Sequence, residues 1–227
     1  MGLTEKSSND RRLVLGSVFL IANALIWYFS AAKVLESVIN SVATDYFQSL
    51  LMWSLHFATL MVSLIAGALL TKRIERKLFF VIWTVIGIIS PLALLVLNFA
   101  QTPVALLISF LFGLSLGLGM PNCMETFTQL TDTKNRGRYG GLIMLLSGLG
   151  VVALGLFDVG SIELTALILI IWRLLGLIIL PFQKLPKERE NNDVSFTFVL
   201  NQKSFILYLI PWLMFSLVAY LGLPIHQ

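Results

Sequence analysis

Long apolar runs separated by short polar connectors make up almost the whole chain. The runs cover residues 13–35, 47–70, 78–98, 103–124, 139–157, 164–182 and 204–223. Each is close to the length of about twenty residues that crosses a bilayer as a helix. None alternates polar and apolar positions as barrel strands do, and irregular backbone cannot face lipid. The pattern therefore predicts an all-α polytopic membrane protein with seven helices.

The composition supports the same class. The chain is 57% hydrophobic and 12% charged, whereas soluble domains carry about twice that charged fraction. Residues 78–124 contain no charged side chain. The first apolar run is longer than the hydrophobic segment of a cleaved signal peptide, so we predict a retained first helix. The single cysteine, Cys123, excludes an internal disulfide and a cysteine-based metal site.

Basic residues are confined to alternate connectors. Fourteen of the sixteen Lys and Arg residues lie within residues 1–12, 71–77, 125–138 and 183–203, and only Lys33 and Arg173 lie elsewhere. The remaining connectors carry acidic charges alone, at Glu36, Asp45, Asp158 and Glu163. Because connectors rich in Lys and Arg stay in the cytoplasm, we predict a multi-pass plasma-membrane protein with a cytoplasmic N-terminus. The net charge of +4 then reflects orientation in the bilayer, and no nucleic-acid partner is predicted.

Two of these basic connectors carry a recognisable motif. The stretch GALLTKRIERK, from residue 67, resembles the cytoplasmic signature between helices two and three of the major facilitator superfamily, roughly G-x-L-a-D-r-x-G-r-k. The stretch NRGRYGGL, from residue 135, resembles the Arg-Gly turn that opens helix five of the same superfamily. The matching residues are Gly67, Leu69, Lys72, Arg76, Arg136, Gly137 and Arg138, whereas Thr71, Ile74 and Glu75 depart from the signature.

The resemblance implies a domain organisation and a function. Residues 1–182 would be the N-terminal six-helix half of such a transporter, residues 183–203 the cytoplasmic loop between halves, and residues 204–227 a seventh helix that begins an incomplete second half. The function implied is secondary active transport of an unidentified small solute by alternating access. The partners implied are the lipid bilayer and a second transporter half, with no cofactor, and the matching motif residues would form a cytoplasmic gate.

Three polar residues inside the apolar runs are candidates for substrate binding. Asn23 lies near the middle of the first run, and Arg173 is near the middle of the sixth. His56 belongs to one face of the second run, which continues through Thr59, Ser63 and Gly67 at helical spacing. A polar group at membrane depth must meet protein or water. For Arg173 the expected partner is an anionic substrate, a backbone carbonyl or an acid on a second half. By the resemblance, the His56 face would line the pathway or meet that half.

Small residues recur along two later runs. The fourth run has them every four residues and the fifth every seven, namely Ser109, Gly113, Gly117 and Pro121, and Gly141, Gly148 and Gly155. In lipid, small residues allow helices to approach closely. We therefore expect both runs to pack tightly against neighbours.

Two other functions fit part of the chain. The stretch GLSLG, from Gly113 to Gly117, fits the G-x-S-x-G pattern of serine nucleophiles, and rhomboid-type intramembrane proteases also carry a serine on helix four. A serine nucleophile needs a base, and the two histidines are His56 and His226. We therefore predict no catalytic residue and no enzyme. A membrane scaffold or assembly subunit that does not transport is the other alternative.

Overall fold

The computed structural model of the chain describes residues 3–71, 73–156 and 161–180. Six helices follow one another, joined by short turns: α1 (Leu3–Val42), α2 (Tyr46–Leu70), α3 (Arg76–Val96), α4 (Thr102–Leu130), α5 (Arg136–Gly155) and α6 (Ile162–Ile179). Each of the first six predicted spans falls in a different helix, and no span extends more than three residues beyond the end of its helix. Five of the helices, α1 to α5, are long and apolar enough to cross a membrane. The described residues are therefore those of an all-helical, membrane-embedded protein, as predicted.

Three features predicted from the sequence lie outside the described residues. They are Lys72 of the turn motif, the loop at 183–203 and the seventh span at 204–223. The bounds of two described helices also differ from the prediction. The first helix is 40 residues long, about 60 Å at 1.5 Å per residue, which is twice the hydrocarbon thickness. The fourth continues through Pro121 and Glu125 to Leu130, because Glu125 finds partners within the protein.

Polar residues in the connectors set where helices begin. The Asp45 carboxylate accepts a hydrogen bond from the backbone N–H of Gln48 at 2.9 Å, at the start of α2. The Ser161 hydroxyl accepts one from the backbone N–H of Leu164 at 3.3 Å, at the start of α6. Each contact satisfies a donor that the first helical turn leaves without an intrahelical partner.

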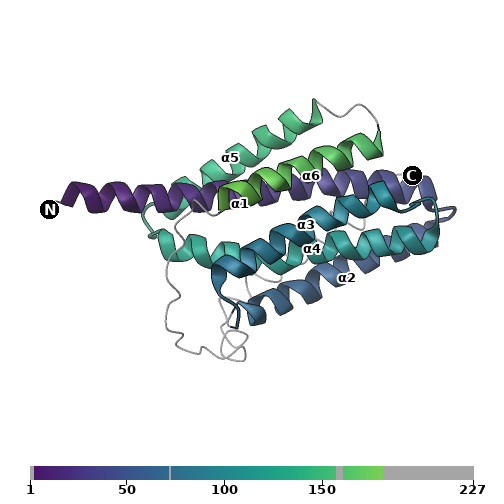
Figure 1. Cartoon of the computed structure of the whole chain (residues 1–227), viewed down its shortest axis with the longest axis horizontal. Coiled ribbons are helices and arrows are strands. Elements are labelled where there is room, and N and C mark those ends of the chain that lie inside the picture. The colour runs from purple at the N-terminus through teal and green to yellow at the C-terminus, as the bar shows by residue number, and fades with distance from the viewer. Residues whose placement is uncertain (1–2, 72, 157–160, 181–227) are drawn as a thin grey trace. The chain divides into compact units, whose positions relative to one another are not determined.

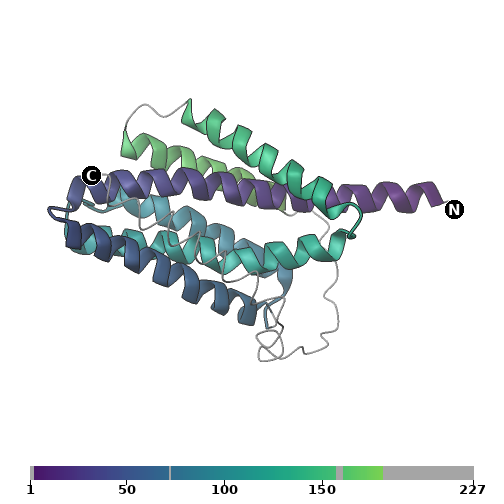
Figure 2. The same cartoon turned by 180° about the vertical axis from the view of Figure 1, so that it is seen from behind.

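Two helices, α1 and α4, form the centre of the bundle. They pack against each other, α2 packs on α4, and α5 packs on α1. Helices α3 and α6 pack together, with α3 also against α4 and α6 also against α1 (Figure 1). Apart from a small contact between α1 and α2, exchanging α1 with α4, α2 with α5 and α3 with α6 reproduces this set of pairings. Because α1 and α4 run in opposite directions (Figures 1 and 2), the packing has the pattern of two inverted three-helix repeats.

The described basic connectors lie together at one end of the bundle. The turns between α2 and α3 and between α4 and α5 are both at the end where α1 begins (Figures 1 and 2). The α1–α2, α3–α4 and α5–α6 connections lie at the other end. The alternation of charge along the sequence thus becomes a charge difference between the two ends of the bundle, called here the basic end and the opposite end.

The buried side chains form two apolar clusters along the bundle axis. The cluster toward the opposite end includes Trp27, Ile39, Phe112 and Leu169. The cluster toward the basic end includes Ile21, Phe80, Trp83 and Phe127. Large apolar side chains are also exposed on every helix, α1 through α6. An exposed apolar surface of this extent is suited to contact with lipid rather than water.

Candidate functional site

A buried arginine lies between the two apolar clusters. Arg173 of α6 is only 1% exposed. Its guanidinium is sandwiched between two indole rings, with Cζ 4.5 Å from the ring centroid of Trp27 on α1 and 4.6 Å from that of Trp83 on α3. Aromatic faces attract cations electrostatically, more strongly where water is excluded. Three helices therefore position one positive charge at the middle of the bundle.

Two glycines make room for this arrangement. A Cβ at Gly87 of α3 would lie 2.7 Å from Nε of Arg173, and a Cβ at Gly119 of α4 would overlap the ring of Trp83. The Trp83 indole N–H also donates to the Ser115 carbonyl on α4. The sequence indicates the buried arginine, but the tryptophans and glycines that hold it come from other helices and were not predicted.

Arg173 and several other buried polar residues have atoms without a hydrogen-bond partner among the described residues. Within the described residues, Nε and Nη2 of Arg173, Nε1 of Trp27, Oγ of Ser115 and both amide atoms of Asn122 are buried and make no hydrogen bond. Ser115, Gly119 and Asn122 follow one another on the same face of α4, the face that packs on Trp83. Leaving such a group unpaired costs about 1–3 kcal/mol. These residues form a set of buried, unpaired polar groups, called here the polar layer.

Asn23 lies in the interface between α1 and α6, where it contacts Trp172 and Gly176. Its side-chain amide donates to the Trp172 carbonyl at 3.4 Å, and the Trp172 indole donates to the Asn23 carbonyl at 3.1 Å. Gly176 leaves space for it, because a Cβ there would lie 2.9 Å from Oδ1 of Asn23. Asn23 thus contacts α6 at Trp172, the residue before Arg173, and Asn23 and Arg173 are both among the three predicted substrate-binding residues. In this state the amide of Asn23 joins two helices.

His56 lies apart from these two residues, between α2 and α4. It is 1% exposed, and Nδ1 lies 3.2 Å from the carbonyl oxygen of Ser109. Nε2 makes no hydrogen bond among the described residues. The predicted polar face of α2 does meet protein, but it packs on α4 within the same bundle, because Gly113 and Gly117 let the two backbones touch.

The basic end holds a compact polar network that joins α3 to α4. Arg76, the first residue of α3, donates through Nη2 to Glu125 at 3.0 Å and through Nη1 to Gln129 at 2.9 Å. The Gln129 amide donates to the same Glu125 oxygen at 2.8 Å. The prediction for Arg76 did not include its partners. Glu125 is the first charge after the uncharged stretch 78–124, and that isolation was the available signal.

Arg136 caps the end of α4 from the start of α5. Its guanidinium donates to the carbonyls of Thr128 and Thr131 at 3.2 and 3.0 Å and to the Thr131 hydroxyl at 3.2 Å. A cation at a helix C-terminus satisfies free carbonyls and complements the helix dipole. Arg136 therefore fixes the turn between α4 and α5.

The other described motif residues differ in their surroundings. Gly67 is buried, and a Cβ there would overlap the Leu118 carbonyl of α4. Leu69, Gly137 and Arg138 are exposed. The structure thus joins Gly67, Arg76 and Arg136 to α4. Leu69, Gly137 and Arg138 remain at the surface.

The serine of the G-x-S-x-G stretch and the buried histidine occupy different sides of α4. Ser115 belongs to the face that packs on Trp83 of α3, whereas His56 packs beside Ser109 and Gly113 on the α2 side. A serine–histidine pair must come within hydrogen-bond reach. The stretch instead places glycines where α2 and α4 meet. Within the described ranges, no three His, Cys, Asp or Glu residues lie close enough together to hold a metal ion.

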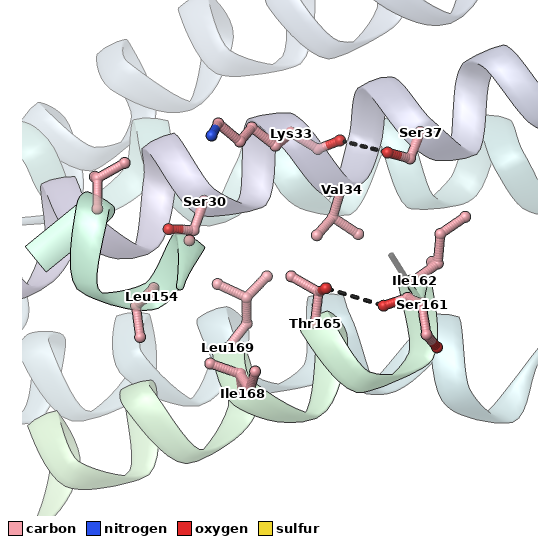
Figure 3. A pocket seen from close by; sticks show the side chains of 12 residues that line it. Ser30, Lys33, Val34, Ser37, Leu154, Ser161, Ile162, Thr165, Ile168 and Leu169 are labelled. Atoms are coloured by element: carbon pink, nitrogen blue, oxygen red, sulfur yellow. Dashed lines mark hydrogen bonds between the residues drawn. The ribbon is translucent and has the colours of Figure 1, made fainter. Parts of the chain in front are cut away.

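A pocket of about 220 Å³ lies near the opposite end, between α1, α5 and α6. Its polar lining includes Ser30, Lys33 and Ser37 from α1 and Ser161 and Thr165 from α6 (Figure 3). Apolar side chains, among them Val34, Leu154 and Leu169, complete its walls. Sequence reasoning did not predict this pocket, because its lining comes from three separated segments.

Comparison with known proteins adds no relative. No protein-family model matches the chain, and no curated protein sequence matches it.

Proposed function

We propose that this chain forms a six-helix half of a secondary active transporter of the major facilitator kind, working with a second six-helix bundle. The observation that carries the proposal is the inverted pairing of α1–α3 with α4–α6, since inverted repeats are the construction common to many secondary transporters. The two partly matched motifs at the basic end favour the same kind of protein. We place the chain in the plasma membrane with its basic end in the cytoplasm, on the distribution of Lys and Arg.

The polar layer at mid-depth would be the solute-binding region. Arg173 offers Nε–H and Nη2–H, and Asn122 offers an amide, all unpaired within the described residues. This donor-rich set suits an anionic solute or one rich in hydrogen-bond acceptors. Asn23 would join the site if α1 and α6 separated, because its present partner is the Trp172 carbonyl. His56 would respond to movement of α2 relative to α4.

The network at the basic end would act as the cytoplasmic gate. Arg76 with Glu125 and Gln129 locks α3 to α4, and Arg136 locks α4 to α5. These contacts lie where the bundle ends rather than at mid-depth. Their breaking and forming would couple motion of the helix ends to access from one side of the membrane.

Whether a second bundle lies against this one can be tested on the exposed face of α5. Only Ile143 and Ser147 are buried along this helix, and a Cβ at Gly141 would meet no atom within 4 Å. Single cysteines would be placed at Gly141 and Val152 of α5 in a Cys123→Ser background, in membranes containing the protein with its second bundle. Matched control cysteines would replace Ile178 and Leu167 of α6, which are 62% and 45% exposed.

We expect a membrane-impermeant maleimide to label both α5 positions, Gly141→Cys from the basic side and Val152→Cys from the other. The two α6 positions should stay unlabelled, because they would face lipid. Equal lack of labelling at all four positions would show that α5 faces lipid or a covering helix, and the proposal would be wrong.

A solute-exchange assay in proteoliposomes then tests Arg173. Arg173→Met preserves apolar bulk but removes the donors of the polar layer. We expect exchange to be lost while the helical content and unfolding midpoint are kept, because Arg173 has no acidic partner among the described residues and removing its charge also removes its desolvation cost. Unchanged exchange would remove Arg173 from the mechanism.

A second function, assembly of a membrane complex, is favoured by one observation. The glycines at 140, 141, 148 and 155 of α5 all leave open space around them, and small residues on an open face allow a partner helix to approach closely. In an assembly subunit the partner helix would cover this face, so the α5 cysteines would not be labelled by the maleimide. Such a subunit would also show no solute exchange with Arg173 intact.

A further inference from the structure

The pocket between α1, α5 and α6 is chemically distinct from the polar layer around Arg173. It lies toward the opposite end, and it is lined by Lys33, one of the two basic residues outside the basic connectors. Lys33 is exposed and forms no ion pair with any described residue. The pocket therefore combines an available positive charge with a defined volume.

The polar groups are not spread evenly around this pocket. The side chain of Lys33 extends along α1 toward Ser30, whereas Ser161 and Thr165 lie toward the start of α6 (Figure 3). Between them lie Val34, Ile168 and Leu169. The part of the pocket near α1 thus carries the Lys33 ammonium and the Ser30 hydroxyl. The part between these groups and the α6 hydroxyls has aliphatic walls.

The hydroxyls near α6 are already engaged. The Ser161 hydroxyl donates to Glu163 at 2.7 Å, and the Thr165 hydroxyl donates to the Ser161 carbonyl at 2.9 Å. Each hydroxyl has one hydrogen, which is already donated, so neither supplies a further donor. The donors open to an anion are therefore the Lys33 ammonium and the Ser30 hydroxyl.

The charge around the pocket limits the ligand to a single negative charge. One ammonium balances one anionic group, and Glu163, which accepts from the lining residue Ser161, would repel a second. The volume of about 220 Å³ is on the order of seven water molecules at about 30 Å³ each, so the ligand portion held inside is small. The aliphatic walls favour a short apolar segment attached to the charged group.

We propose that this pocket binds a monoanionic amphiphile, with its carboxylate or phosphate at Lys33 and Ser30 and its apolar portion against Val34 and Leu169. The same chemistry is offered by a soluble short-chain acid and by the head of an anionic lipid. Binding here is separate from transport through the polar layer and does not depend on it.

Binding of radiolabelled octanoate to the full chain in phosphatidylcholine nanodiscs tests the proposal. We expect saturable binding, and Lys33→Gln should weaken it roughly tenfold or more because a charge-assisted contact is lost. Lys33→Arg should retain binding. Lys77→Gln is the matched control, since Lys77 is exposed at the basic end and carries the same charge. Octanol, which has the chain without the charge, should bind far more weakly than octanoate.

A steric pair tests the location independently of charge. Gly155 lines the pocket and Gly148 does not, yet a Cβ at either would meet no atom within 4 Å. Gly155→Leu should therefore abolish octanoate binding by filling the pocket, and Gly148→Leu should leave binding unchanged. Both variants should keep the unfolding midpoint of the parent chain, which separates a filled pocket from a misfolded chain.

The source of the ligand is distinguished by a lipid arm. Nanodiscs containing phosphatidylglycerol should block octanoate binding if a lipid head group is the occupant, with bound lipid retained in native mass spectrometry by the parent chain and lost in Lys33→Gln. Octanoate binding that persists in those nanodiscs assigns the pocket to a soluble acid. The proposal is overturned if neither probe binds saturably, or if Lys33→Gln and Lys77→Gln weaken binding equally.

Discussion

The α2–α4 and α1–α5 interfaces occupy equivalent places in the two three-helix repeats, but they pack in different ways. In the first, Gly113 and Gly117 of α4 lie so close to α2 that a Cβ on either would overlap its backbone. In the second, the glycine of α5 that faces α1 is Gly150, where a Cβ would overlap only the side chain of Ile26, while Gly141 and Gly148 lie on the exposed face of α5. The tight interface buries His56 and Ser63, whereas the loose one borders a pocket of about 220 Å³.

The difference shows what small residues need in order to bring helices together. On α2 the facing residues are themselves small or polar, and the Ser63 hydroxyl donates to the Gly113 carbonyl at 3.3 Å. On α1 the side chain that meets α5 is Ile26, which lies against Gly150. A branched apolar side chain keeps these two backbones apart.

Adding a methyl group to the tight interface should have the largest effect. Gly113→Ala would force the new Cβ into the His56 carbonyl, which belongs to a helix backbone and cannot rotate away. We expect a loss of roughly 2 kcal/mol in the free energy of unfolding. Gly148→Ala, made on α5, should instead raise stability by up to about 1 kcal/mol through helix propensity. Unfolding in mixed micelles measures both, and equal effects would show that Gly113 is no more closely packed than the exposed Gly148.

Loss of the ion pair at the basic end should rank second. Arg76→Gln removes the link from α3 to Glu125 and shortens the reach to Gln129. Because the Arg76 side chain is 7% exposed and that of Glu125 is 42% exposed, we expect a loss of about 1–2 kcal/mol. Arg138→Gln, at an exposed position of α5, should change stability by less than about 0.5 kcal/mol. The same unfolding assay checks the pair, and a larger effect at Arg138 would contradict the structure.

A methyl group at the one close glycine of the loose interface should have little effect. Gly150→Ala would meet the end of the Ile26 side chain, which can change rotamer. We expect a change within about 0.5 kcal/mol, because the gain in helix propensity offsets the rearrangement. Ile26→Val in the same chain should remove any residual loss. A loss as large as that of Gly113→Ala would show that the α1–α5 interface is as rigid as α2–α4.

The smallest expected effect is on the pKa of Glu163, which lies at the rim of the pocket and just before the predicted sixth span. The Ser161 hydroxyl donates to the Glu163 carboxylate and holds the pKa of Glu163 below its ordinary value. A depressed pKa means that this contact stabilises the fold above the pKa of the unfolded chain, and the contribution is lost as pH falls through the folded value. Ser161→Ala should raise the pKa of Glu163, as followed by carboxyl NMR. No change would show that the hydrogen bond is absent in the membrane.

Much of the architecture followed from the sequence. Six of the spans were predicted because about twenty apolar residues can satisfy their backbone in lipid only as a helix. The grouping of basic turns at one end followed from their alternation. Arg173 was identifiable as unusual because no charge is expected at that depth. These features depend on local composition, which the order of residues states directly.

Only the tertiary structure decided which helices meet and what each polar residue touches. Gly113 of α4 and Gly148 of α5 both belong to regular small-residue patterns, yet one is in close contact and the other is open. Likewise, the partners of Arg173 are two indole rings from helices far away in the sequence. The physical reason is that contact between helices in lipid depends on the shapes of both surfaces, and the facing surface is known only once the bundle has formed.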